Sequence, residues 1–263
     1  MKRYLTIISV WFQNSLTYRT MVFTYRIGEL IEILILVTLW LAIYSKVPIV
    51  SGFTQNEMIT YVLVGNIFYM VVRDFSHRLF AREIVIGKLS FYLVKPLSHL
   101  RHFLAATFGR STHILMGIVS QIILISLFHK FIIINVSAAA IGVIIVMLML
   151  ARINELLTNY LLGMIAFWTD EVEPIQDTLS SIRRFLSGGL FPLSLLPIGL
   201  ATFTYGLPFA YYFFFPMQLF LGKVDIGAGL RGLLIQSAWI LILYLAIRIV
   251  WARGLKRYEG VNS

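Results

Sequence analysis

The chain contains no cysteine, and only 13% of its 263 residues are charged. Without cysteine it has no disulfide bonds, no thiolate catalysis and no cysteine-based metal site. Acidic residues are especially few, 12 against 22 basic ones, so the formal net charge is +10. Soluble domains are usually about one quarter charged. The shortage of charge therefore argues against an ordinary soluble enzyme and indicates a membrane protein.

Apolar residues make up most of the chain, 59% of its residues. They gather in runs of the roughly 20 residues that a helix needs to cross a bilayer. We therefore predict an all-α polytopic membrane protein, a single transmembrane domain over residues 1–263. Its six transmembrane helices are expected at residues 21–44, 56–75, 103–128, 136–168, 178–196 and 230–251.

The N-terminal residues 1–20 predict an amphipathic helix that lies on the membrane surface. Leu5, Ile8 and Trp11 recur at helical spacing, and Gln13 and Asn14 interrupt the apolar stretch. That interruption, with no small-residue cleavage site after it, is unlike a signal peptide. A helix at the interface is the preferred interpretation. The alternative is a soluble helix that packs on the protein's own loops.

Basic residues predict the orientation. Six spans put both termini on one side, and cytoplasmic loops carry the excess of Lys and Arg. Four basic residues flank the opposite side, Lys46, Lys130, Lys223 and Arg231. Sixteen flank the side of the termini: Lys2, Arg3, Arg19, Arg26, Arg73, Arg78, Arg82, Lys88, Lys95, Arg101, Arg183, Arg184, Arg248, Arg253, Lys256 and Arg257. Both termini are therefore predicted to be cytoplasmic in the plasma or inner membrane. The positive charge indicates contact with membrane lipids, not with nucleic acid.

Residues 197–222 are strongly apolar but contain a proline or glycine every few positions. A seventh span here would reverse the C-terminus, so short re-entrant helices are expected instead. The aromatic run 211–215 also fits an interfacial anchor belt with no ligand role. The candidate residues of this region, including the approach to it, are Gly188, Gly189, Pro192, Pro197, Pro208 and Pro216.

Two short motifs imitate ATPase signatures and fail. Gly87–Lys88 lacks the earlier glycine of a P-loop, because Arg82 stands there, and Leu89 replaces the following Ser or Thr. The "LSGG" at 186–189 is followed by Leu190 in place of Gln. The sequence also lacks H-E-x-x-H and G-x-S-x-G motifs. We expect no ATP hydrolysis, no metal site and no cofactor in this chain.

Several charged or titratable residues fall inside the expected spans, where charge is costly and marks either function or helix pairing. One interpretation is a polar pathway or proton relay, and the other is a set of ion pairs that fix helix packing. An intramembrane acid–base enzyme using the two N-terminal glutamates is a third, weaker alternative. The candidates are Arg26, Glu29, Glu32, Arg110, His113, Arg152 and Glu155.

A short, basic, amphipathic segment within residues 76–101 separates the second and third expected spans. It is too polar to cross a membrane. An apolar face of Ile84, Leu89, Tyr92 and Leu93 is expected among basic residues. Gly87 suits a turn or a close backbone approach, and Pro96 suits a helix end. The candidate contact residues are Arg82, Glu83, Gly87, Lys88, Leu89, Tyr92 and Pro96.

This order of elements resembles the type 2 ABC exporter permeases. The stretch "REIVIGKLSFYLVKPLS" is similar to the family's coupling helix between spans 2 and 3. The stretches "FLSGGLFPLSLLP" and "LPFAYYFFFPMQLFLG" are similar to its sequence around span 5 and the re-entrant helices. The resemblance covers nearly the whole chain.

The resemblance implies a permease subunit that forms the substrate pathway of an exporter. It implies two copies of an ABC ATPase subunit, which hold the ATP and Mg²⁺, and a second permease subunit, identical or a sister chain. The few charges in the spans favour a drug-like, amphipathic or lipid-like substrate. The alternative is a non-transporting membrane scaffold or an accessory intramembrane enzyme. Co-purification with an ATPase distinguishes these.

Overall fold

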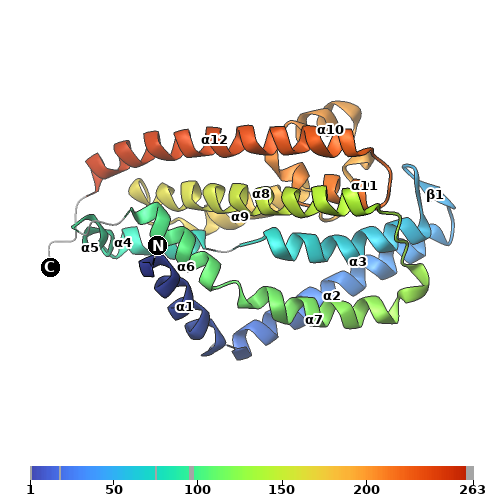
Figure 1. Cartoon of the computed structure of the whole chain (residues 1–263), viewed down its shortest axis with the longest axis horizontal. Coiled ribbons are helices and arrows are strands. Elements are labelled where there is room, and N and C mark those ends of the chain that lie inside the picture. Colours follow the sequence, from blue (N-terminus) through green and yellow to red (C-terminus); the bar gives the residue numbers. More distant parts are fainter. Residues whose placement is uncertain (1, 18, 75, 95–97, 259–263) are drawn as a thin grey trace.

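A computed structural model of the chain describes residues 2–17, 19–74, 76–94 and 98–258 (Figure 1). It is nearly all-helical, with one two-stranded hairpin. In chain order the elements are α1 Lys2–Thr17, α2 Arg19–Tyr44, β1 Ile49–Val50, β2 Phe53–Thr54, α3 Gln55–Val72, α4 His77–Val85, α5 Leu89–Leu93, α6 His99–Gly109, α7 Thr112–Leu127, η1 His129–Phe131, α8 Ala138–Gly163, η2 Met164–Phe167, α9 Glu173–Leu186, η3 Leu193–Leu195, α10 Ile198–Tyr205, η4 Pro208–Tyr211, α11 Phe214–Phe220 and α12 Ile226–Arg257.

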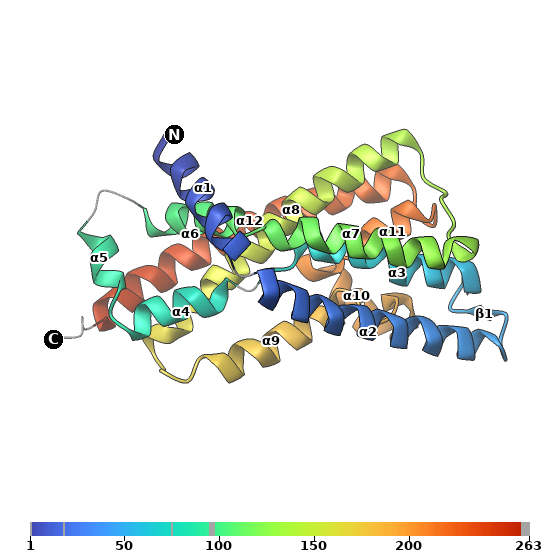
Figure 2. The ribbon, with the colours of Figure 1, turned by 90° about the horizontal axis from the view of Figure 1, so that it is seen from below.

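The long helices run roughly along one axis of the molecule (Figures 1 and 2). The last helix, α12, packs along α8, and α8 also contacts α3, which in turn contacts α2 and α7. The hairpin, α10 and α11 lie at one end of this bundle. At the other end lie α4, α5 and the C-terminal end of α12, with α1 running obliquely across the bundle nearby. The segment between α3 and α6 therefore lies at the same end of the bundle as α1 and the C-terminal end of α12.

Side-chain caps define where three of the long helices begin. Thr54 and Glu57 form a capping box at the start of α3, in which the Thr54 N–H donates to the Glu57 carboxylate at 2.8 Å. Ser137 caps α8 by accepting from the Ala140 N–H at 3.2 Å, and Asp225 caps α12 in the same way. Each cap satisfies backbone donors that the helix itself leaves without partners.

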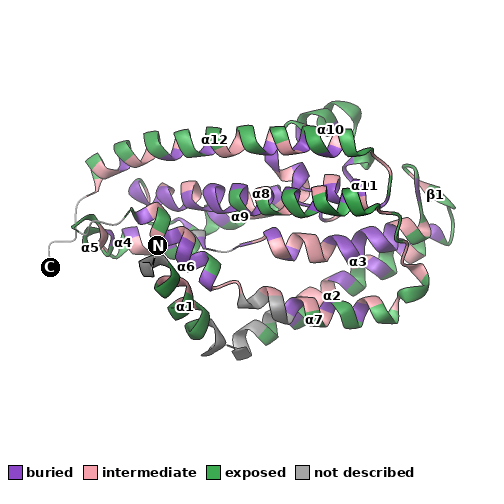
Figure 3. Cartoon of the chain, in the orientation of Figure 1, coloured by how far each residue is buried: buried purple, intermediate pink, exposed green. Residues whose placement is uncertain are grey.

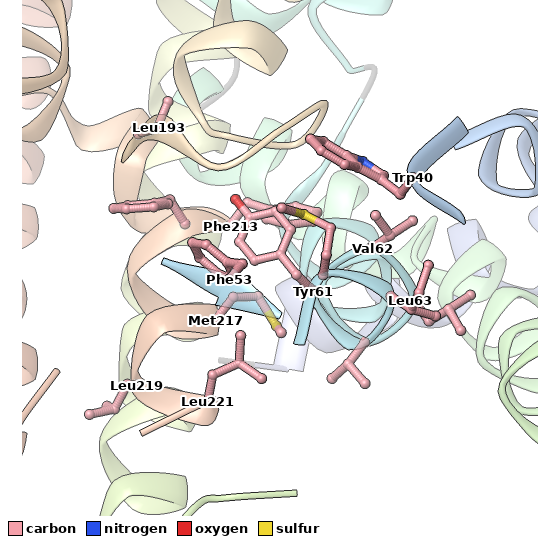
Figure 4. Close-up of a cluster of buried hydrophobic side chains, with 14 of the residues drawn as sticks. Trp40, Phe53, Tyr61, Val62, Leu63, Leu193, Phe213, Met217, Leu219 and Leu221 are labelled. Atoms are coloured by element: carbon pink, nitrogen blue, oxygen red, sulfur yellow. The ribbon is translucent and has the colours of Figure 1, made fainter. Parts of the chain in front are cut away.

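Two large apolar cores, one toward each end, and a third small cluster of Val72, Ala151 and Tyr212 hold the described bundle together. The larger core joins α2, α3, α8 and α11, and Tyr61 packs against Phe213 with ring centroids 5.0 Å apart (Figure 4). The smaller core joins α4, α8 and α12, and Phe80 stacks on Tyr160 at 4.4 Å. Outside these cores, much of the outer face of α12 is exposed (Figure 3), as expected of a helix that faces lipid.

Three helical stretches are long and apolar enough to cross a membrane in the described part of the chain, at Arg26–Tyr44, Ala138–Phe167 and Ile226–Arg257. The pair Ile198–Tyr205 and Pro208–Phe220, bent by 77°, adds a fourth if it is one broken span. The predicted membrane-protein class is confirmed, and these three stretches lie at the first, fourth and sixth expected spans. A helix, α3, lies at the second expected span, but it is not among the candidate spans. The described part of the chain has three candidate spans, or four with the bent pair, whereas six were expected.

The third expected span is two helices, α6 and α7, which meet at Arg110 and Ser111. The helix is interrupted at these two residues, next to the place where α1 packs against α6. A Cβ atom on Gly109 would lie 2.5 Å from the Ile8 carbonyl oxygen, so glycine permits this contact. A helix is present at the N-terminus as predicted, and it packs on α6 and α7 of the protein itself; its position on the membrane surface stays a prediction.

The fifth expected span is wrong in its bounds and character. Here α9 is amphipathic and ends at Leu186, well before residue 196. The chain then turns at Gly188, whose φ of +81° suits glycine, and continues through Pro192 into a short 3₁₀ turn. The apolar residues after Gly188 therefore pack as loop and short helices. The hairpin Ile49–Val50 and Phe53–Thr54 was not predicted from the sequence.

Candidate functional site

The predicted coupling residues lie on α4, on α5 and in the turn between them. Gly87 occupies this turn with a φ of +74°, which explains the need for glycine. A Cβ atom on Gly163 of α8 would lie 2.5 Å from Phe80, so α4 approaches α8 very closely. This contact packs the α4–α5 segment into the smaller core, which it shares with α8 and α12. Pro96 lies outside the described residues.

The apolar face of this segment is oriented differently from the prediction. Leu89 is fully buried and Ile84 nearly so, both in the core shared with α8 and α12. Their side chains therefore hold the segment onto its own chain and are not available to a partner. Of the same expected face, Leu93 is exposed and Tyr92 is half-buried, so the sequence pattern identified an amphipathic segment correctly but not which of its residues face outward.

Other apolar side chains of this segment are exposed. Val94 is 82% exposed and Phe91 is 58% exposed. Together with Ile86 and the exposed Lys88 they form the outer face of the segment. Below, the exposed face of the α4–α5 segment means Ile86, Lys88, Phe91 and Val94.

Glu83 and Tyr92 belong to the inner side of the segment. The Glu83 carboxylate lies 3.2 Å from Nε2 of His99, and the Tyr92 hydroxyl lies 3.2 Å from Nε2 of His102. Burial, followed by the nearby Glu83 carboxylate, raises the pKa of Tyr92. Arg82 remains exposed. These contacts connect the segment to the first turns of α6.

The predicted intramembrane charges form an ion-pair network between helices. Glu29 of α2 pairs with Arg26 one turn away and with Arg73 at the C-terminal end of α3. Glu32 pairs with Arg184 of α9 at 2.6 Å. Both carboxylates are thus engaged by arginine, an arrangement that favours helix pairing over acid–base chemistry.

Arg152 and Glu155 share a helix face but do not pair with each other. Arg152 donates to the Asp74 carboxylate at 3.2 Å and to the Arg73 carbonyl at 2.7 Å. It therefore neutralises the carboxylate and caps the C-terminal end of α3. Glu155 instead accepts from Arg183 of α9 at 2.8 Å.

Sequence reasoning missed several members of this network. Arg183 also donates to the Asn159 side chain at 2.9 Å, and Asn159 donates to the Asp74 carbonyl at 3.0 Å. Asp74, Asn159 and Arg183 are each at most 8% exposed. The sequence did contain one signal of this network, the polar residue Asn159 in an otherwise apolar helix. Nothing in the linear pattern pointed to Asp74.

A polar cavity of about 160 Å³ lies beside the network, where α3 and α8 meet α9. Arg73, Glu155, Arg183 and Arg184 line it, together with Ser180. It is large enough for several water molecules and offers charged partners of both signs. The structure thus brings together Glu29, Glu32, Arg26, Arg152 and Glu155 as one polar layer across α2, α3, α8 and α9.

Arg110 contacts the N-terminal helix. Its guanidinium packs over the Trp11 ring of α1 at 4.1 Å from the centroid, a cation–π contact at the α6–α7 break. The His113 side chain lies outside what the structure describes.

The predicted re-entrant residues lie at the opposite end of the bundle. The Gly188 carbonyl accepts from the buried Tyr61 hydroxyl at 2.7 Å, which fixes the turn after α9. Gly189 and Pro192 are buried in the same turn. Pro197 precedes α10, Pro208 begins η4 and Pro216 lies in α11. Gly188, Pro197 and Pro208 thus lie at the turns and starts of the short helices.

Comparison with protein families decides the class of this arrangement. The model of the ABC-2 family transporter proteins matches residues 30–261, nearly the entire chain. The chain belongs to this family. The curated proteins compared with the chain include no match.

As an ABC-2 family transporter protein, the chain is an integral membrane permease component of an ABC exporter. Permeases of this family associate with an ABC ATPase and often form dimers. The charged layer and the exposed face of the α4–α5 segment therefore belong to the membrane component of a transporter, which is generally not the ATPase itself.

Proposed function

We propose that this permease exports an amphipathic or lipid-like substrate, driven by two copies of a separate ABC ATPase that bind ATP and Mg²⁺. A second permease subunit, identical or a sister chain, completes the pathway. The exposed face of the α4–α5 segment docks on the ATPase. Both termini and this segment are cytoplasmic, because the Lys and Arg excess lies on their side.

One observation supports the proposal: this face is apolar and lies beside the C-terminal end of α12. The Ser90 N–H donates to the Tyr258 hydroxyl at 3.2 Å, so α5 lies level with the end of α12. Tyr258 follows Arg248 by ten residues, so the end of α12 and the neighbouring α5 lie up to about 15 Å past Arg248 along the helix. Apolar side chains exposed there face water unless a partner covers them.

The contacts of the segment suggest how ATPase closure reaches the spans. Phe80 stacks on Tyr160, which attaches α4 to α8. Arg78 of α4 pairs with Asp177 of α9. Further along α9, Arg183 reaches α8 and Arg184 reaches α2. Movement of the segment is therefore delivered to α8 directly and to α2 through α9.

The test is an ATPase pull-down with Val94→Asp, which places a charge in the proposed contact. Ile134→Asp is the matched control, because Ile134 is a similarly exposed β-branched residue in the loop before α8. We expect Val94→Asp to lose ATPase binding and transport-coupled hydrolysis, and Ile134→Asp to keep both. Normal binding and transport by Val94→Asp would contradict the proposed docking face.

The second candidate function is a membrane scaffold or accessory enzyme that does not transport. Purified permease should hydrolyse no ATP alone and regain turnover with its ATPase in vesicles. Extraction of a fluorescent amphiphile from the vesicles measures transport. Assembly with the ATPase but no extraction of any amphiphile would favour the scaffold.

A further inference from the structure

A second concave site lies away from the charged layer, at the cytoplasmic end of α12. It is a cavity of about 410 Å³ between α5, the start of α6 and α12. Its lining includes Arg248, Tyr244 and Trp251 of α12, Ser98 and His99 before and in α6, and Leu93 of α5. We propose that this cavity binds the headgroup and glycerol region of a phospholipid from the adjacent leaflet.

The depth of Arg248 in the membrane supports this ligand. No residue between Arg231 and Arg248 is charged, and both arginines are on α12. Their separation of 17 residues corresponds to about 26 Å of helix, close to the roughly 30 Å hydrocarbon thickness of a bilayer. Arg231 and Arg248 therefore bracket the hydrocarbon, and the cavity opens at the level of the lipid phosphates.

The charge in the cavity is complementary to a phosphate. The Arg248 side chain is exposed, and within the described part of the chain no carboxylate pairs with it. Arginine is well suited to bidentate contact with phosphate oxygens. The Ser98 hydroxyl lies on the same cavity and makes no cap hydrogen bond with α6, so it is available as a second donor.

The floor of the cavity is rigid and aromatic. Tyr160 is 1% exposed, and its hydroxyl bonds Nδ1 of His99 at 3.0 Å. The other nitrogen of His99 is bonded to Glu83, and its ring stacks on Trp251 at 5.7 Å. These contacts hold the rings in place before a ligand arrives, which lowers the entropic cost of binding. Aromatic rings at this depth suit the ester region of a lipid.

The remaining walls of the cavity are apolar. Leu93 is exposed, Leu100 is half-buried and Ile247 is buried behind them. Arg248 and Ser98 would thus take the phosphate, while these aliphatic side chains contact the glycerol region. A surface belt of aromatic residues alone would provide no such cavity.

A lipid in this position contacts both α5 and α12. Under the proposed function, the lipid holds the α4–α5 segment against the last span. Only this consequence and the name of the leaflet rest on the proposed function. Binding itself depends only on the membrane depth of α12, so its test does not require transport.

The test measures phospholipid binding to the purified full-length permease after delipidation, by native mass spectrometry. The probe is 1-palmitoyl-2-oleoyl phosphatidylglycerol, and diacylglycerol with the same chains is the comparison without phosphate. We expect the phospholipid to bind more tightly than the diacylglycerol. Arg248→Gln should weaken phospholipid binding about tenfold through loss of a charged hydrogen-bond donor. Ser98→Trp, which fills the cavity, should abolish it.

Arg231→Gln is the matched control, since it removes the same charge at the other end of α12. It should bind the probe as the unchanged protein does. Thermal unfolding in detergent checks that the variants remain folded. Equal binding by Arg248→Gln and Arg231→Gln would overturn the proposal, as would equal binding of diacylglycerol. Displacement of the probe by millimolar glycerol 3-phosphate would also overturn it, because the site would then select a soluble phosphate.

Discussion

The Arg183 guanidinium on α9 donates a 2.8 Å hydrogen bond to the Glu155 carboxylate on α8, and both side chains are buried. This ion pair attaches the amphipathic helix α9 to the apolar helix α8. Because Arg184 beside it pairs with Glu32 of α2, two neighbouring arginines of α9 connect it to two different helices. Helix α9 is therefore attached to α8 and α2 by ion pairs.

Removing one partner of the buried pair should destabilise the protein strongly. Glu155→Leu leaves the Arg183 charge buried without its carboxylate, which costs about 3–5 kcal/mol. The double variant Glu155→Leu with Arg183→Leu should recover most of this loss, because neither charge then remains. Unfolding in mixed detergent micelles with increasing SDS measures the free energies. A single variant as stable as the unchanged protein would show that the pair is not formed.

The pair between Glu32 and Arg184 should contribute much less. Its side chains are 40% and 23% exposed, so solvent screens the attraction. A double-mutant cycle with Glu32→Gln and Arg184→Gln should give a coupling free energy of about 0.5–1 kcal/mol. The charge-exchanged double variant, Glu32→Arg with Arg184→Glu, should restore part of it. A coupling free energy of zero in this cycle would show that the two side chains do not interact.

Two glycines of α8 should respond oppositely to alanine. At Gly163 a Cβ atom would lie 2.5 Å from the Phe80 ring, which is itself fully buried. Gly163→Ala should therefore lower stability by about 1–3 kcal/mol. Gly142 has no atom within 4 Å of its Cβ position. Gly142→Ala should raise stability by about 0.5–1 kcal/mol through helix propensity. The same unfolding measurement compares both, and equal effects would refute the close α4–α8 approach.

The orientation can be tested by cysteine labelling, since the chain has no cysteine of its own. Ser90→Cys on α5 should react with a membrane-impermeant maleimide only after the cells are permeabilised. Ser194→Cys, exposed at the opposite end, should react in intact cells. Labelling of Ser90→Cys in intact cells would reverse the proposed topology.

Local patterns in the sequence were sufficient to determine the membrane class and most of the helices. The uncharged apolar runs around Val37, Ile144 and Leu243 lie inside α2, α8 and α12, because hydrophobic length is a property of the chain itself. The same holds for the bend at Pro197, where backbone chemistry restricts the conformation, whereas the turn at Gly188 fell inside an expected span. The Arg26–Glu29 pair was also predictable, since residues three apart on a helix are neighbours.

Only the tertiary structure decided which groups meet across helices. The same spacing rule suggests that Arg152 pairs with Glu155, yet these residues pair with Asp74 and Arg183, 78 and 28 positions away. The rotation of each helix about its own axis determines such partners, and that rotation follows from packing the whole bundle. The same reason explains why Leu89 is buried and Val94 is exposed: an amphipathic pattern defines two faces, but the neighbouring helices determine which face they cover.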